Sequence, residues 1–381
     1  MRITDVRATP VNVPFTEPEI WSQGARHGIT AIIVEVETDT GIIGIGESVP
    51  APNPAVTVAA ITSAADLLVG KDPRQVRAIW SQLQGPGGWA AFDRAGNAAL
   101  AGVEMALWDI VGKALDCTVA DLFGGAIRDH IEVMGFVQNA KSDVMEREAA
   151  AMATAGYGTL YTKVGFGEKR DVSAATALRT GGGDAVEIRI DPNEAWSPGF
   201  ALAMAHRLAD LRVQYIEQPI RAVGVSEMAL LRQRSPVPIA ANQSSWTNEN
   251  VMDLVRANAA DVIMTDPWQA GGLTRFAEAA AICEHAGIPL VYHSFAPLSI
   301  ATRAAMAVLT TTTAVTYAHQ TYNHMTAGDI VTDPVEIIGG RIDVSDRPGL
   351  GCSIDPDLLA ARHDDYRRDG YMNPYGNPNR L

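Results

Sequence analysis

The chain is poor in cysteine and in positive charge. Its 381 residues include three cysteines, Cys117, Cys283 and Cys352, which are scattered and form no close pair at zinc-binding spacing. This pattern argues against a disulfide framework and predicts a reduced, cytoplasmic protein. Lys and Arg number 30 against 44 Asp and Glu, so the net charge is −14. That charge argues against nucleic acid or an anionic membrane as a partner, but a small acidic substrate remains possible if local cations or a metal outweigh the distant field.

Long apolar runs are also missing. No uninterrupted apolar stretch is long enough to span a bilayer, and the N-terminus, Met1 to Val6, alternates like a strand and lacks the apolar core of a signal peptide. Apolar content of 47% and charged content of 19% are ordinary for a globular protein. The length suits two domains, or one barrel with additions.

A polar or ionisable residue recurs at a nearly fixed interval, each time at the end of a short apolar run. These residues are Lys163, Asp191, Glu217, Gln243, Asp266, His293 and Gln320. Each run resembles a buried strand followed by a helical stretch, and seven or eight such units close into a parallel barrel. Because the C-terminal strand ends of a barrel converge on one mouth, we expect a single ring of side chains. The last run, Ala314 to Tyr317, is expected to be the eighth strand.

The first part of the chain predicts a different architecture, an α+β domain of residues 1–125. A loop over residues 15–28, which holds Trp21, Arg26 and His27, is long enough to be a lid, although a mobile surface excursion is an equal alternative. The barrel is expected over residues 126–325, and residues 326–381 are expected to pack back on the first domain. The expected strands are Ile3–Val13, Thr30–Glu37 and Ile42–Glu47, and the expected helices are Ala55–Val69, Pro73–Leu83 and Arg94–Leu115.

Two carboxylates of the ring suggest a metal. Asp191 and Glu217 end neighbouring strands, which lie about 5 Å apart, so they would repel each other unless a cation lies between them. Hard oxygen ligands suit Mg²⁺ or Mn²⁺, and pairing with rim arginines is the alternative. Lys163, one strand earlier, could hold a substrate carboxylate or merely neutralise Asp191. Tyr161 shares its face and could move a proton if cations lowered its pKa, or could simply be packed and hydrogen-bonded.

A histidine and an aspartate complete the chemistry. Asp266 and His293 end adjacent strands across the ring from Lys163. A carboxylate bonded to one imidazole nitrogen fixes the tautomer and raises the basicity of the other, as a general base requires. The assembled groups suit removal of a proton α to a carboxylate, through an enediolate stabilised by metal and lysine.

Several longer motifs also occur in order along the chain: Ala101–Lys113, Leu122–Gly125, Thr162–Gly165, Ile190–Asn193, Ile216–Pro219, Thr265–Gly272 and Tyr292–Ser294. In these motifs the sequence resembles the enolase superfamily, in its mandelate racemase and muconate lactonizing branch. The resemblance covers nearly the whole chain. It implies a capping α+β domain on a modified (β/α)₇β barrel, Mg²⁺ at the mouth, an Asp266–His293 acid/base dyad, and substrate contacts from Trp21, His27 and Asn53. It also implies a small-molecule carboxylate substrate and a homo-oligomer.

Three positions depart from the pattern of the family. The third metal ligand, usually Glu, falls on Gln243, and the first lysine of a Lys-x-Lys pair falls on Tyr161. The acidic residue at the last strand end falls on Gln320, a candidate substrate-binding residue. An amide can still bind Mg²⁺, but the site then lacks one negative charge, so the empty enzyme should hold the metal more weakly.

These departures favour one reaction among several. A racemase needs a base on each face of the carbon, and the usual lysine opposite His293 is lost. A dehydratase can work with His293 alone, which takes the α-proton and then protonates the leaving β-hydroxyl. We therefore expect a Mg²⁺-dependent dehydratase of a hydroxylated, acid sugar-like carboxylate. The alternatives are a racemase, epimerase or cycloisomerase at the same carbon, and a catalytically silent ligand-binding relative.

Overall fold

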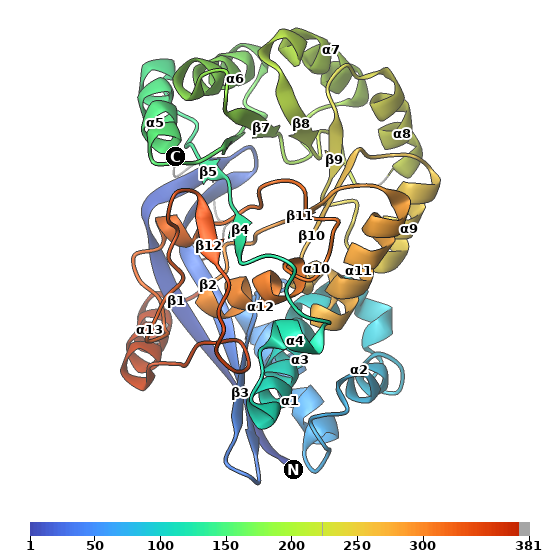
Figure 1. Cartoon of the computed structure of the whole chain (residues 1–381), viewed down its shortest axis with the longest axis vertical. Helices are drawn as coiled ribbons and strands as arrows, with labels where there is room; N and C mark the ends of the chain where they lie inside the picture. Colours follow the sequence, from blue (N-terminus) through green and yellow to red (C-terminus); the bar gives the residue numbers. More distant parts are fainter. Residues whose placement is uncertain (223, 373–381) are drawn as a thin grey trace.

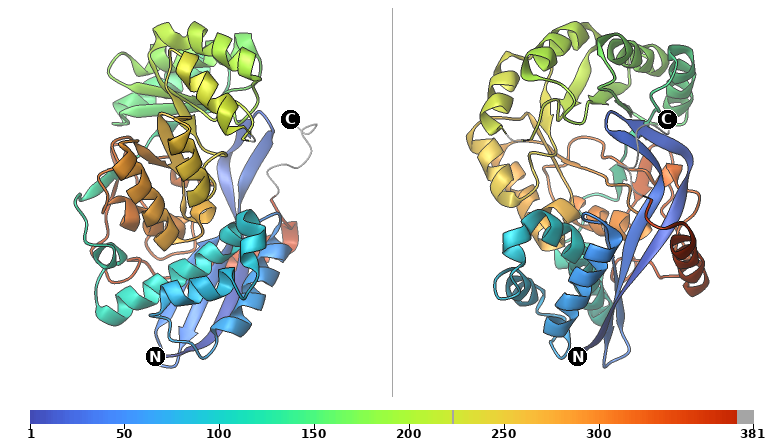
Figure 2. Two further views of the ribbon diagram at one scale, coloured as in Figure 1. Left: turned by 90° about the vertical axis from the view of Figure 1, so that its right-hand side faces the viewer. Right: turned by 180° about the vertical axis from the view of Figure 1, so that it is seen from behind.

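Two units lie side by side in the computed structural model, which describes residues 1–222 and 224–372. An antiparallel sheet with helices forms the N-terminal unit, and a curled parallel sheet ringed by helices forms the other (Figures 1 and 2). This arrangement confirms the predicted capping α+β unit on a modified barrel.

The N-terminal sheet corrects one prediction. Its order is β1-β2-β3, with β1 (Ile3–Trp21), β2 (Gly24–Thr38) and β3 (Ile43–Ser48). The predicted loop over residues 15–28 is therefore wrong, because most of it belongs to a β-hairpin whose tip pairs Trp21 with Gly24. Pro18 is tolerated in β1 because it lies in the register shift between Pro14 and Glu19, where ladder hydrogen bonds are interrupted.

The three predicted helices are present. They are α1 (Pro54–Leu68), α2 (Val76–Gln84) and α3 (Asp93–Leu115), followed by the short α4 (Val119–Leu122). Helix α2 begins later than predicted because Asp72 holds Arg74 in a local turn, accepting its backbone N–H at 3.1 Å. Glycine lets α3 pack tightly on the sheet, since a Cβ on Gly46 would lie 1.8 Å from the Gly102 carbonyl oxygen.

The second sheet is parallel and has the order β5-β6-β7-β8-β9-β10-β11. Its buried, β-branched strands explain the continuous apolar runs of the sequence. Helices alternate with the strands and cover the outside of the sheet (Figure 1). The strands are β5 (Gly135–Phe136), β6 (Thr159–Lys163), β7 (Glu187–Asp191), β8 (Val213–Glu217), β9 (Ile239–Ala241), β10 (Val262–Thr265) and β11 (Leu290–Tyr292), and the helices are α5 (Ser142–Thr154), α6 (Glu168–Gly182), α7 (Pro198–Leu208), α8 (Val225–Arg234), α9 (Asn248–Arg256), α10 (Pro267–Ala270), α11 (Leu273–Ala286) and α12 (Ser299–Leu309).

The predicted eighth strand at Ala314–Tyr317 is not a regular strand. The chain from Ala314 to Gln320 still closes the gap between β11 and β5. The Ala314 and Tyr292 carbonyls accept the N–H groups of Leu290 and Gln320, and the His319 carbonyl accepts the N–H of Met134. The Tyr292 N–H instead donates to Nδ1 of the His319 imidazole at 2.8 Å. A side chain thus takes the place of a backbone acceptor, which interrupts the ladder.

The C-terminal segment contacts both units. Strand β12 (Arg341–Asp343) pairs with β4 (His130–Glu132), next to the barrel. Helix α13 (Pro356–Asp369) lies along β1, where the ring nitrogen Nδ1 of His363 is 2.7 Å from the Pro10 carbonyl oxygen. Residues 373–381 of the predicted segment lie outside the described residues.

Buried carboxylates of the cap hold helices of the barrel. Helix α12 begins after Leu298 without a side-chain cap of its own. Glu47 of β3 supplies one, because its two carboxylate oxygens accept the N–H groups of Leu298 at 2.8 Å and Ala301 at 3.0 Å. Glu104 of α3 does the same for Leu273, at 2.6 Å, at the start of α11. A carboxylate is favoured at a helix N-terminus, so these contacts fix the cap on the barrel.

Glu47 leads to an expected pH dependence of stability. Burial raises the pKa of Glu47 from 4.5 to about 8, against the effect of its two N–H donors. Between these values the folded state binds more protons than the unfolded state, so this group makes stability fall as pH rises, by up to about 1.4 kcal/mol per pH unit. Glu47→Gln cannot ionise and should lose this component.

The comparison is made on thermal unfolding midpoints measured from pH 5 to pH 9. The midpoint of Glu47→Gln relative to the parent should rise with pH up to about pH 8. Glu336→Gln, which changes an exposed carboxylate, should show a constant difference. A constant difference for Glu47→Gln as well would refute the prediction.

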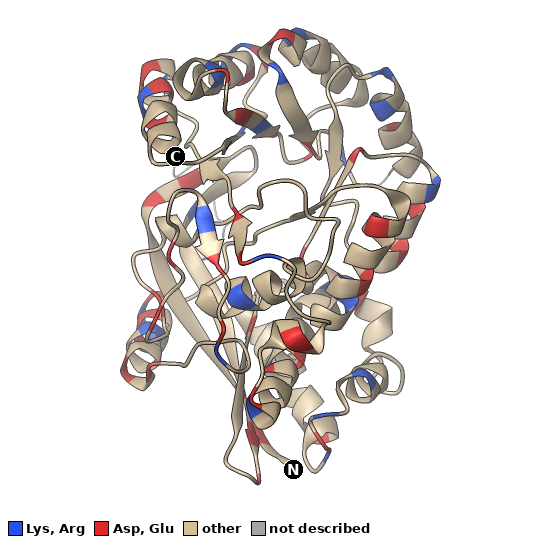
Figure 3. Cartoon of the chain, in the orientation of Figure 1, with Lys and Arg blue, Asp and Glu red and all other residues tan. Residues whose placement is uncertain are grey.

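Charge and hydropathy agree with a globular exterior. Lys/Arg and Asp/Glu are interspersed along the outer helices α5 to α9 and do not gather by sign (Figure 3). Over the part of the chain that the structure describes, no helix is both long and apolar enough to cross a membrane.

Candidate active site

The first group at the barrel mouth is centred on Asp191. Lys163 and Asp191 end β6 and β7 in register, and Lys163 Nζ lies 2.7 Å from Asp191 Oδ2. The Tyr161 hydroxyl donates to the same oxygen at 3.0 Å, while Oδ1 accepts the Asn193 N–H at 2.7 Å. Burial opposes the charge of Lys163, but Asp191 raises the pKa of Lys163 above its ordinary value. Lys163 is therefore a buried cation.

Tyr161 is a hydrogen-bond donor in this arrangement. Burial and the Asp191 carboxylate raise the pKa of Tyr161 well above 10. The expected lowering of the Tyr161 pKa requires a metal cation beside Lys163, so it stays a prediction. The predicted role of Tyr161 in catalysis also stays a prediction.

The second group is centred on Glu217, at the end of β8. Burial and the neighbouring Asp191 carboxylate raise the pKa of Glu217 well above its ordinary value. Gln320 donates to Glu217 Oε2 at 2.7 Å through its amide nitrogen, and its Oε1 accepts the Ser294 N–H at 3.1 Å. Both ends of the Gln320 side chain are thus engaged, and it connects Glu217 to the residue after His293.

Unpartnered oxygens indicate where a cation fits. Glu217 Oε1 and Gln243 Oε1 are buried and have no hydrogen-bond partner among the described residues. With Asp191, they would form an oxygen set of two carboxylates and one amide, which suits Mg²⁺ or Mn²⁺. Residues 1–222 and 224–372 contain no cluster of three or more His, Cys, Asp or Glu side chains placed to hold a metal. Metal binding by Asp191, Glu217 and Gln243 stays a prediction.

The third group is the predicted dyad. His293 Nδ1 lies 2.8 Å from Asp266 Oδ2, and Asp266 Oδ1 accepts the N–H groups of Trp268 at 2.8 Å and Gln269 at 2.9 Å at the start of α10. Because an ionised carboxylate only accepts hydrogen bonds, Nδ1 carries the proton and Nε2 can accept one. The Phe295 ring lies edge-on to the imidazole, with centroids 4.5 Å apart. Asp266 and Phe295 thereby fix the orientation of the imidazole, and the predicted role of His293 as a general base stays a prediction.

The predicted cap residues do not gather at one point. Trp21 is buried at the hairpin tip, with the Arg26 guanidinium 5.5 Å from its ring centroid. His27 is exposed on β2. Asn53 is the N-cap of α1, and its side chain accepts the Val56 N–H at 3.1 Å. Substrate binding by these three residues stays a prediction.

The sequence analysis missed a buried arginine inside the barrel, Arg189. Arg189 lies two residues before Asp191 on the same face of β7, so period-two alternation could have indicated it. Its guanidinium donates to Gln214 Oε1 and to the Ala318 carbonyl, both at 2.6 Å. It also lies 4.6 Å from the Tyr215 ring centroid. Its positive charge lowers the pKa of Glu217, partly offsetting burial.

A buried ion pair inside the hairpin was also missed. Arg26 Nε lies 3.4 Å from Glu19 Oε2, and the Tyr322 hydroxyl donates to Glu19 Oε1 at 2.8 Å. Arg26 Nη1 donates to the Phe295 carbonyl at 3.0 Å. The Ser22 hydroxyl donates to a carbonyl after β7, at 3.0 Å. The hairpin tip is thus bonded to loops that follow β7 and β11.

Fold and site together define a capped parallel barrel with its polar strand ends at one mouth, the position at which barrel enzymes carry their active sites. Two family models match: "Mandelate racemase / muconate lactonizing enzyme, N-terminal domain" over residues 3–124 and "Enolase C-terminal domain-like" over residues 144–358. The chain belongs to the enolase superfamily, in its mandelate racemase and muconate lactonizing enzyme branch.

Curated relatives carry the names of different reactions. N-succinyl-L-Arg/Lys racemase of Bacillus cereus is 27% identical, covering 94% of this chain and 97% of the relative. A probable glucarate dehydratase of Streptomyces coelicolor is 28% identical, covering 95% and 91%. The crystal structure of an enolase from Thermobispora bispora complexed with magnesium and formate is 28% identical, with a TM-score of 0.88, covering 98% and 94%. These comparisons establish the family, and its members include both racemases and dehydratases.

Proposed function

We propose that the protein is a metal-dependent dehydratase that removes the proton α to the carboxylate of a hydroxylated acid. The observation that carries this proposal is the one-sided arrangement of bases. His293 contacts Asp266 through Nδ1, which leaves Nε2 for a substrate, whereas Lys163 and Tyr161 are both bound to Asp191. A reaction that needs one base therefore suits the site better than one that needs two.

Some residues of the site stabilise negative charge on the substrate, and others support proton transfer. Mg²⁺ held by Asp191, Glu217 and Gln243 would polarise the substrate carboxylate when bound. The Lys163 ammonium stabilises the negative charge that develops on that carboxylate as the α-proton leaves. The Asp266 carboxylate stabilises the imidazolium form of His293.

Dehydration then proceeds at two neighbouring carbons. His293 Nε2 takes the α-proton, and the electron pair of the C–H bond is left on the enediolate. That pair forms the carbon–carbon double bond as the β C–O bond breaks, and the imidazolium protonates the leaving hydroxyl to give water. Where the α-carbon carries a hydroxyl, the resulting enol becomes a 2-oxo acid.

A second candidate is a racemase, epimerase or cycloisomerase at the same carbon. It is favoured by the position of Lys163 and Tyr161 together on the face opposite His293, from which a proton could be returned. The similarity to a relative named as a racemase also supports this second candidate. The third candidate, a ligand-binding relative without catalysis, is favoured by the neutral Gln243.

Product analysis in D₂O tests the three candidates. The protein is incubated with Mg²⁺ and a panel of 2,3-dihydroxy carboxylates, and the products are followed by NMR. A dehydratase should give 2-oxo-3-deoxy acids. Epimers that carry α-deuterium without loss of water would instead indicate a racemase or epimerase. No exchange in any compound, together with no metal uptake, would favour the silent relative.

A further inference from the structure

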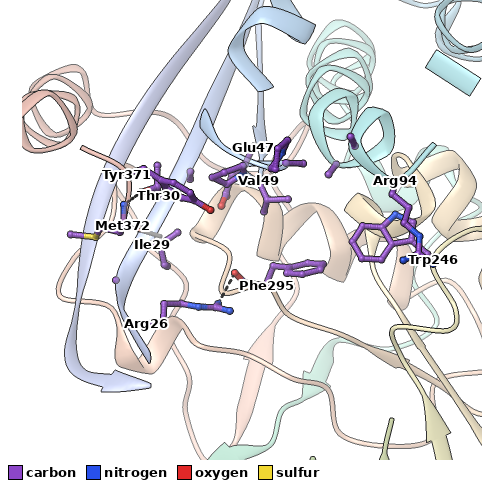
Figure 4. Close-up of a pocket in the computed structure, with 17 residues that line it drawn as sticks. Arg26, Ile29, Thr30, Glu47, Val49, Arg94, Trp246, Phe295, Tyr371 and Met372 are labelled. Atoms are coloured by element: carbon purple, nitrogen blue, oxygen red, sulfur yellow. Dashed lines mark hydrogen bonds between the residues drawn. The ribbon is translucent and has the colours of Figure 1, made fainter. Parts of the chain in front are cut away.

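A cavity of about 330 Å³ lies between the cap and the barrel mouth (Figure 4). Its cap side comes from β2, β3 and the first turns of α3. Its barrel side is aromatic, with Phe295 following β11 and Trp246 following β9. The walls are mostly hydrocarbon, and the residues used below are Ile29, Ala31, Val49, Ala98, Trp246 and Phe295.

The cavity begins beside the proposed base. The Phe295 ring packs edge-on against His293, at 4.5 Å between centroids, and also lines the cavity. Trp246 lies next to Phe295, at 5.9 Å between centroids, and is three residues after Gln243 in the chain. Phe295 thus contacts both the proposed base and the cavity, which makes this cavity the candidate space for the distal end of a substrate held at His293.

Two polar side chains of the inner walls, Glu47 and Thr30, already have protein partners. Both carboxylate oxygens of Glu47 accept backbone N–H groups, from Leu298 and Ala301. The Thr30 hydroxyl donates to Asn12 Oδ1 at 2.6 Å. At these two residues a ligand competes with hydrogen bonds that the protein already makes.

The two arginines of the cavity are also engaged or lie at its rim. Arg26 donates to the Phe295 carbonyl, as the dashed line in Figure 4 marks, and lies beside Glu19. Arg94 is exposed, and its guanidinium lies 5.3 Å from the Trp246 ring centroid. A row of hydroxyl groups on a ligand would leave water at these walls without gaining matching partners, which costs binding free energy.

We propose that the substrate of the reaction put forward above carries an apolar distal segment, alkyl or aryl, that occupies this cavity. The inference rests on the proposed function. It departs from the sequence-based expectation of an acid sugar, because the distal carbons of an acid sugar all carry hydroxyls. A cavity of about 150 Å³ already accommodates benzene, so this one has room for a phenyl ring with a short linker.

Two probe compounds test the inference, and both have an α-proton and a β-hydroxyl. They are 2,3-dihydroxy-5-phenylpentanoate, as a mixture of stereoisomers, and a six-carbon aldonate. Dissociation constants are measured by calorimetry with Mg²⁺ present. The phenyl compound should bind at least about 100-fold more tightly, because each buried, unpaired hydroxyl of the aldonate costs about tenfold. Equal or tighter binding of the aldonate would overturn the inference.

Variants of the cavity wall test whether the cavity causes the preference for the phenyl compound. Ala95→Phe, on α3, fills the cavity and should bring the ratio of the two dissociation constants towards one. Ala150→Phe, on the exposed face of α5, should leave the ratio unchanged. Val49→Thr adds a hydroxyl at nearly constant volume and should shift the ratio towards the aldonate, which keeps the test decisive if Ala95→Phe does not fold. An unchanged ratio in Val49→Thr and in any folded Ala95→Phe would contradict the proposal.

The same compounds separate this inference from the proposed function. Alpha-proton exchange in D₂O and the appearance of a 2-oxo acid report on the reaction, whereas the ratio of dissociation constants reports on the cavity. Tight binding of the phenyl compound without exchange would refute the dehydratase and support the apolar site. Exchange of the α-proton in a tightly bound aldonate would support the proposed reaction and refute the apolar site.

Discussion

Replacing His293 with asparagine should lower the rate of α-proton exchange by about 10³-fold, the range in which a positioned general base contributes. Asparagine can still donate a hydrogen bond towards Asp266, but it has no nitrogen that takes up a proton at neutral pH. The measurement is the loss of the substrate α-proton signal in D₂O, followed by NMR with Mg²⁺ present.

Two controls accompany this variant. His285→Asn changes an exposed histidine of α11 and should leave exchange within twofold or so of the parent. Calorimetric binding of the substrate to His293→Asn should persist, because Lys163 and the oxygen set are untouched. If His293→Asn exchanged the proton within about tenfold of the parent rate, the base would have to be another residue.

The ring of strand ends could be predicted from the sequence because it depends on short-range rules. Parallel strands place their C-terminal ends at one mouth, and side chains alternate with period two, so Lys163 and Asp191 had to be neighbours. The Asp266–His293 contact follows from the same rules, since β10 and β11 are adjacent. Each of these predictions needs only the register of neighbouring strands.

Contacts between distant parts of the chain could not be predicted in this way. Glu47 binds Leu298 across 251 residues of sequence, and nothing in either local pattern indicates the other. Residues 15–28 are predicted as a loop because they separate the two expected strands, whereas the Glu19–Arg26 ion pair that helps hold the hairpin is visible only after folding. The prediction of a regular eighth strand was wrong. The side chain of His319, and not a backbone carbonyl, accepts the Tyr292 N–H, so the ladder is interrupted there.

Replacing Gln243 with glutamate should increase the affinity for metal. A neutral amide in place of a carboxylate leaves two negative charges in the oxygen set, so Gln243→Glu should bind Mg²⁺ or Mn²⁺ at least about tenfold more tightly. The unpartnered, buried Gln243 Oε1 places the new carboxylate oxygen where the amide oxygen now lies. Calorimetric titration of the metal alone, without substrate, measures the change independently of turnover.

Gln320→Glu is the matched control for this titration, because it adds the same charge at another position of the ring. Gln320 now donates to Glu217 Oε2, so a carboxylate there would lose that hydrogen bond and repel Glu217. Its gain in metal affinity should therefore be smaller than that of Gln243→Glu. Equal gains would mean that charge in the barrel mouth matters and that Gln243 is not a ligand. A larger gain at Gln243 alone would support ligation and the lower metal affinity that two carboxylates and an amide imply.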